Sequence, residues 1–141
     1  MHQAAQAYSK TARATVTPRQ LEAGLLLKAA HKLQHVKENW DNHSSTLHDA
    51  LYYNRKLWTV LVTSVTRPEN PLSQPIKQNI ANLGMFIFDR TIAVQINPDP
   101  QKLDILISIN KDIAAGLSAT PAGSEQTPSK AQAPQPTKAQ A

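Results

Sequence analysis

Residues 47–84 read LHDALYYNRKLWTVLVTSVTRPENPLSQPIKQNIANLG, and this stretch decides the fold. Its first half repeats apolar residues at the spacing of one helix face, at Leu47, Leu51, Trp58, Leu61 and Val65. Pro68 ends that helix, because the residue before a proline is pushed out of the helical region. After a corner at residues 67–71, Ser73 is expected to cap a second helix that has Pro75 in its first turn. The stretch therefore predicts two long helices joined by a proline-rich corner.

A further helix is predicted before this stretch. Thr17, Pro18 and Gln20 form its start signal: a capping threonine, a proline at the first helical position and a glutamine three residues after the cap. We expect this helix to end at residues 39–42. Its apolar stripe is predicted to contain Leu21, Leu25, Ala29, Val36 and Trp40, widened by Leu26, Ala30 and Leu33.

The helix after Ser73 is apolar around much of its circumference, which predicts a central position contacted by several helices. A break at residues 97–100 precedes the last helix, which we expect to end near Gly116. The stripe of the last helix is Leu103, Leu106, Ile113 and Leu117, with Ile107 and Ile109 beside it. No Asn-Gly or Asp-Gly turn separates alternating strands, so the prediction is an all-α protein, a small bundle of four to five helices.

The chain divides into one folded domain and a tail. Residues 1–117 are predicted to form the helical domain, in which residues 1–15 are a marginal or mobile helix. Residues 118–141 contain no Leu, Ile, Val, Phe, Trp or Tyr. Such a segment cannot bury enough apolar surface to offset its ordering entropy, so it is predicted to be a disordered tail.

Charge and composition exclude several functional classes. The formal net charge is +5, but the densest basic run is the pair Arg55 and Lys56, which favours a solvated surface over a nucleic-acid patch. The chain has no cysteine, so disulfides and thiolate chemistry are excluded. The first residues lack the apolar core of a secretion signal, and the longest apolar segment, residues 80–96, is interrupted by polar residues. We expect a cytoplasmic protein without membrane insertion.

Motifs for catalysis or metal binding are absent from the sequence. His31 and His35 are four residues apart on a helix, but Lys32 stands where the HExxH motif has glutamate, so two solvated histidines are the favoured interpretation. The sequence has no GxSxG, GxGxxG or P-loop pattern and only four glycines. We therefore predict a protein that is not an enzyme and that holds no metal or cofactor.

Polar residues inside the apolar stripes are more informative. Asn54 lies between Leu51 and Trp58, Asn110 lies in the last helix's stripe, and Arg90 follows Ile87. They predict either a hydrogen-bond network that sets helix register, which we favour, or a groove whose polar groups await a partner.

Trp58 has two interpretations, core packing and an interface anchor, of which core packing is favoured. Tyr53 and Arg55 fit a solvated surface and a partner interface equally well.

Four segments together resemble the bacterial FlaF-type flagellar biosynthesis regulators. They are AYSKTARATVTPRQLEAGLLLKAAHKL (7–33), LYYNRKLWT (51–59), RPENPLSQPIKQNIANLG (67–84) and KLDILISINKDIAAGL (102–117). Each segment alone is a weak signal, and the specificity comes from their order and spacing. The recurrent positions of the family fall on Asn54, Arg55, Trp58, Arg67, Pro68, Asn79, Asn82 and Asn110.

The resemblance implies a non-enzymatic protein that is needed for flagellin production and acts alongside a second regulator, FlbT. Its implied direct partner is flagellin, whose terminal amphipathic helices would lie in a groove of the bundle. The alternatives are regulation of flagellin mRNA, directly or through the FlbT-type partner, and a scaffold that binds the FlbT-type regulator. The residues predicted to bind the partner are Tyr53, Asn54, Arg55, Trp58, Arg67, Asn79 and Asn82.

Overall fold

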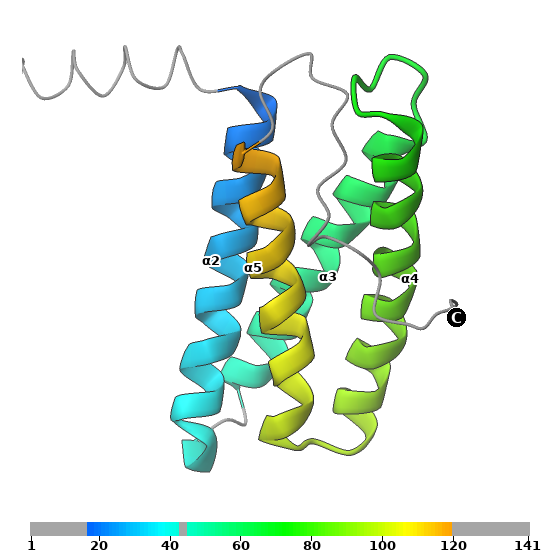
Figure 1. The fold of residues 1–141 in the computed structure, drawn as a ribbon. Helices are drawn as coiled ribbons and strands as arrows, with labels where there is room; N and C mark the ends of the chain where they lie inside the picture. The colour runs from blue at the N-terminus through cyan, green and yellow to red at the C-terminus, as the bar shows by residue number, and fades with distance from the viewer. Residues whose placement is uncertain (1–16, 43–44, 120–141) are drawn as a thin grey trace, which may run out of the picture.

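Four long antiparallel α-helices form the computed structural model, which describes residues 17–42 and 45–119 (Figure 1). They are α2 (Pro18–Glu38), α3 (Thr46–Val65), α4 (Gln74–Ile96) and α5 (Leu103–Ala119). Two single-turn 3-10 helices, η1 (Trp40–Asn42) and η2 (Pro100–Lys102), lie in the connections before α3 and α5. No strand occurs among the described residues, and the predicted all-α class is confirmed.

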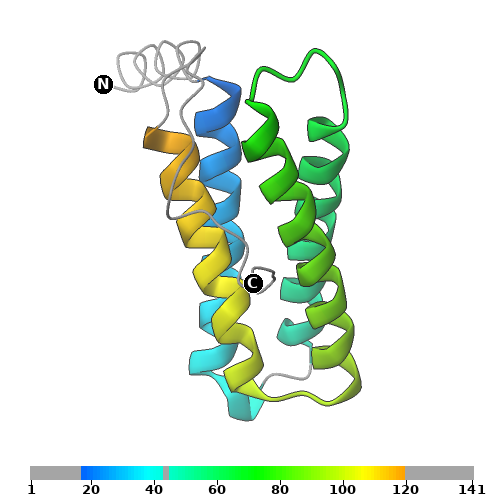
Figure 2. The ribbon, with the colours of Figure 1, turned by 45° about the vertical axis from the view of Figure 1, so that its right-hand side comes forward.

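The two helices that approach each other most closely are α2 and α5, which lie side by side in both views (Figures 1 and 2). Small buried side chains on both helices, such as Ala23, Ala30 and Ala114, permit this approach, because interaxial distance depends on the side chains at the contact. α3 packs against both α2 and α4, whereas α4 and α5 contact each other least of the neighbouring pairs. The chain thus closes a four-helix bundle whose tightest seam joins its first and last described helices.

The predicted central position of α4 is wrong. α4 packs mainly against α3, and Met85, Ile92 and Ile96 on its outer side are exposed to solvent. Phe86 and Phe88 are only half-buried at the edges of its core face. The apolar circumference of α4 therefore reflects apolar residues left on the surface, and not contact with several helices.

The predicted helix starts are largely confirmed. Thr17 and Gln20 form a reciprocal capping box, since each side chain accepts a hydrogen bond from the other's backbone N–H at 3.1 Å. Ser45 and Ser73 occupy the N-cap positions of α3 and α4, although neither side chain makes a capping hydrogen bond. The last helix continues to Ala119, past the end expected near Gly116.

The core stripes of α3 and α5 are those predicted, and their apolar members are buried in one continuous cluster with those of α4. The stripe of α2 is wrong in its first turns. Leu21 and Leu25 are 59% and 36% exposed, and Ala23, which was not assigned to the stripe, is buried, whereas Leu26 is buried as predicted. The reason is the close approach of α5, which turns the row that begins with Ala23 inward.

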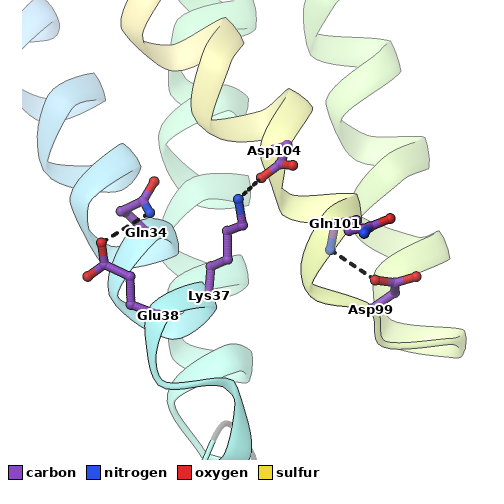
Figure 3. Close-up of polar contacts among 6 residues, drawn as sticks. All are labelled: Gln34, Lys37, Glu38, Asp99, Gln101 and Asp104. Atoms are coloured by element: carbon purple, nitrogen blue, oxygen red, sulfur yellow. Dashed lines mark hydrogen bonds and ion pairs between the residues drawn. The ribbon is translucent and has the colours of Figure 1, made fainter.

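Polar contacts tie the lower end of the bundle together (Figure 3). The ammonium of Lys37 on α2 lies 2.5 Å from the carboxylate of Asp104 in the first turn of α5. Asp99 caps η2 by accepting a hydrogen bond from the backbone N–H of Gln101 at 2.9 Å. The ion pair is partly exposed, so it orients α2 and α5 but contributes at most about 1 kcal/mol to stability.

Gly84 is required where α3 and α4 touch, and this yields a prediction. A Cβ at this position would collide with the Cγ2 of Val62, whose branched side chain has one preferred rotamer in a helix. We expect Gly84→Ala to lower the free energy of unfolding by about 1–3 kcal/mol, measured by urea denaturation.

The control for Gly84 is Gly24, where an added Cβ would meet nothing within 4 Å. Gly24→Ala should stabilise the protein by about 0.5–1 kcal/mol through helix propensity alone. Val62→Ala should rescue Gly84→Ala. Equal effects of the two glycine substitutions would contradict the collision.

Two predicted segments lie wholly or mostly outside the residues that the structure describes. The marginal helix at residues 1–15 precedes the described residues, and the predicted tail lies beyond them apart from Ser118 and Ala119, which extend α5. Within residues 17–42 and 45–119, no helix is long and apolar enough to cross a membrane.

Candidate functional site

A buried chain of hydrogen bonds links α3 to α5. The indole Nε1–H of Trp58 donates to Oδ1 of Asn110 at 2.8 Å, and Nδ2 of Asn110 donates to Oδ1 of Asn54 at 2.7 Å. All three side chains are 0% exposed. Because the low dielectric of a core strengthens hydrogen bonds and penalises unpaired groups, this chain favours one axial register of α3 against α5.

This geometry confirms the predicted network for Asn54 and Asn110 and the core packing of Trp58. Arg90 is not part of it: its guanidinium lies 5.4 Å from the ring centroid of Phe86 at the edge of α4. A partner cannot touch Asn54 or Trp58 while the bundle is closed. Their predicted contribution to partner binding would have to act through the fold.

Tyr53 and Arg55 point to different sides of α3, because two residues along a helix are about 200° apart. The ammonium groups of Lys28 and Lys32 on α2 lie 5.7 and 5.1 Å from the ring centroid of Tyr53. Arg55 instead lies 5.4 Å over the ring of Tyr52. Tyr53 therefore belongs to the seam with α2, and Arg55 does not.

The remaining predicted residues lie near the corner between α3 and α4 or on α4 itself. Arg67 is exposed and lines a cleft of about 320 Å³ together with Lys77 and Gln78. Asn82 is exposed and accepts a hydrogen bond from Nε2 of Gln78 at 3.0 Å, and Asn79 is half-buried. The structure thus distributes the predicted residues over several faces, and their partner binding stays a prediction.

An exposed apolar surface lies along the seam of α2 and α3, and it was not predicted from the sequence. Tyr53 places the two helices relative to each other through its contacts with Lys28 and Lys32. Leu25 and Leu21 lie three and seven residues before Lys28, on the same side of α2. On this side of α2, the exposed residues therefore change from lysine to leucine toward the N-terminus of the helix.

Because α2 and α3 are antiparallel, the matching direction on α3 runs from Tyr53 toward its C-terminus. Leu57 and Val60 follow Tyr53 by four and seven residues and so share its side of the helix. Leu57 is half-buried and Val60 is 62% exposed. We call this surface the α2–α3 face; it consists of Leu21, Leu25, Lys28 and Lys32 of α2 and Tyr53, Leu57 and Val60 of α3.

A cleft of about 500 Å³ continues the α2–α3 face toward the other end of the seam. Lys28 and Lys32 form its border with the face, and His31, His35, Thr46 and Asp49 are among its other lining residues. The face and the cleft together present leucine and valine at one end and mainly basic side chains at the other.

The described histidines and carboxylates are the other side chains that could carry chemistry. Among residues 17–42 and 45–119, no three His, Asp or Glu side chains are grouped so that they could hold a metal ion. Burial raises the pKa of Glu22, and the neighbouring guanidinium of Arg19 opposes that rise. Glu22 is thus a half-buried carboxylate beside a buried arginine, which helix packing explains without a function. The candidate site is therefore the α2–α3 face.

The sequence did contain a signal for this face. In α2 two rows compete at helical spacing: Leu21, Leu25, Lys28 and Lys32, and the row of Ala23, Leu26, Ala30 and Leu33. The first row contains leucines and lysines, and lysine is almost never fully buried in a core. This mixture indicates an exposed amphipathic surface.

Comparison with known proteins gives one match. Residues 4–117 match the model of a protein family described as flagellar protein FlaF. No curated protein and no solved structure matches the chain.

Proposed function

The chain belongs to the FlaF family of flagellar proteins, and we propose that it promotes flagellin synthesis or secretion by binding flagellin as a chaperone-like partner. The observation that carries this proposal is the α2–α3 face, where Leu21, Leu25 and Val60 remain exposed although the bundle has a complete core without them. Exposed apolar residues gathered on one face of a small protein mark an interaction surface. Flagellin termini are amphipathic helices, which suit such a face.

Direct regulation of flagellin mRNA is less favoured by the distribution of basic residues. Arg55 and Lys56 both lie over the ring of Tyr52, and Arg90 lies over Phe86. Lys77 lines the separate cleft at the corner. An RNA site needs basic side chains that follow a phosphate backbone together, and these residues occupy separate places on α3 and α4.

The test of the proposed function is a titration of the purified full-length protein with monomeric flagellin from the same bacterium. We expect a dissociation constant of about 10 μM or tighter, measured by calorimetry. A parallel titration uses flagellin leader RNA at two salt concentrations, and a third uses the FlbT-type regulator. Binding to the RNA or to the FlbT-type regulator without binding to flagellin would overturn the proposal in favour of that partner.

A further inference from the structure

We propose that the α2–α3 face docks an amphipathic helix of another protein, with the partner's apolar stripe on the leucines and its acidic side chains at Lys28 and Lys32. The identification of the partner as flagellin rests on the proposed function. The location of the surface and the charge of the helix that it accepts rest on the packing of α2 and α3.

The whole face has the dimensions of a helix contact. Along α2 it extends from Leu21 to Lys32, which is roughly 17 Å at 1.5 Å per residue, or about three turns. Leu21 and Val60 are 59% and 62% exposed, so each has most of its side-chain surface available for burial. Leu57 of the α3 row is half-buried and packs against the core, so it connects the face to the interior of the bundle. A partner helix can therefore lie along the seam with residues spaced three and four apart as anchors.

The charged half of the face sets the chemistry of the partner. The ammonium groups of Lys28 and Lys32 are both held over the ring of Tyr53. No ion pair joins either lysine to a carboxylate of the described residues. Two neighbouring ammonium groups, positioned by one ring and lacking a carboxylate partner, complement aspartate or glutamate on the flank of an incoming helix.

Charge also decides between possible occupants. Residues 1–16 of this chain contain His2, Lys10 and Arg13 and no acidic residue, so they would bring positive charge toward Lys28 and Lys32. A second copy paired in parallel through the same face would bring the two lysine pairs together, and an antiparallel pairing would place each lysine pair against the leucines of the other copy. An acidic amphipathic helix of another protein meets neither penalty.

The experiment uses the full-length protein and two synthetic helical probes of about five turns. Both probes carry the same leucine stripe, and one is flanked by glutamate and the other by lysine. Fluorescence anisotropy should show the glutamate probe binding at least about tenfold more tightly than the lysine probe, and added salt should reduce this difference. Leu25→Glu, and Lys28→Glu combined with Lys32→Glu, should each weaken binding of the glutamate probe by about tenfold or more.

Matched controls separate the face from general surface charge. Leu27→Glu replaces a leucine that is 44% exposed two residues along α2, and Ile92→Glu replaces an exposed isoleucine on α4. Both controls should bind the glutamate probe within about twofold of wild type. Circular dichroism and urea denaturation should show that all variants remain folded.

The outcomes for the face and for flagellin can be told apart. Loss of probe and flagellin binding in Leu25→Glu but not in Leu27→Glu supports both proposals. Flagellin binding that is unchanged in Leu25→Glu overturns the face while the proposed function stands. Probe binding with the expected variant pattern, but no flagellin binding, supports the face and overturns flagellin as its partner. The proposal for the face is overturned if the glutamate probe does not bind. It is also overturned if Leu25→Glu alters self-association, which would indicate a second copy as the occupant, or increases hydrogen exchange of residues 1–16, which would indicate that segment.

Discussion

Trp58→Ala is expected to lower the free energy of unfolding by about 3–5 kcal/mol, the largest effect of a single substitution in this chain. The substitution removes a fully buried indole from the middle of the core and leaves a cavity. It also leaves Oδ1 of Asn110 without its donor. Urea denaturation followed by circular dichroism measures the loss as a lower midpoint with little change in slope.

Trp58→Phe separates the two causes of this effect. Phenylalanine fills much of the cavity but cannot donate to Asn110, so we expect a loss of about 1–3 kcal/mol from the unpaired oxygen. An unchanged midpoint in Trp58→Ala would contradict the buried position of the indole. If Trp58→Ala also abolishes flagellin binding, that loss reports damage to the fold and not a lost contact. Surface variants such as Arg55→Ala are therefore the better probes of binding.

Asn110→Leu is expected to have the second largest effect, a loss of about 2–4 kcal/mol. Leucine has the same branched side-chain skeleton as asparagine and a larger volume, so the substitution leaves no cavity and the cost comes mainly from the polar groups. It removes the acceptor of the Trp58 Nε1–H and the donor to Oδ1 of Asn54 in one step. Both groups are then buried without a partner, and thermal or urea denaturation measures the penalty.

A double-mutant cycle with Asn54→Leu tests whether the two asparagines act together. Asn54→Leu alone should cost less than Asn110→Leu, because it leaves only Nδ2 of Asn110 unpaired and removes Nδ2 of Asn54, which has no partner among the described residues. The double variant should be more stable than the sum of the single effects predicts, by about 1 kcal/mol or more. Strict additivity would show that the two side chains do not share a hydrogen bond that matters for stability.

Local rules account for much of the fold. The capping box at Thr17, the proline corner and the stripes of α3 and α5 follow from spacing and capping chemistry, which act within a few residues. The pairing of Asn54 with Asn110 was also indicated, because both interrupt apolar stripes and a buried amide needs a partner. Their 2.7 Å contact joins residues 56 apart in the chain.

Most of the candidate surface was not predicted, because its two leucines on α2 were assigned to the core; of its residues, only Tyr53 was predicted to bind a partner. By hydrophobicity alone, Leu21 and Leu25 are better core residues than Ala23, and the predicted stripe accordingly contained the two leucines and omitted Ala23. Residues predicted from the family pattern, such as Arg55 and Asn82, are exposed but lie on different faces. Recurrence in a family does not say which side chains share a surface.

The sequence by itself determined that this protein is all-α, where its helices begin, and which rows of residues could be buried, because propensity, capping and periodicity are local properties. Only the tertiary structure decided which row of α2 faces inward. α5 packs closely against α2, and the inward row of α2 contains Ala23 and Ala30, whereas Leu21 and Leu25 lie outside that row. The leucines are therefore left beside Lys28 on the surface, and the same packing that completes the core forms the face that we propose for the partner.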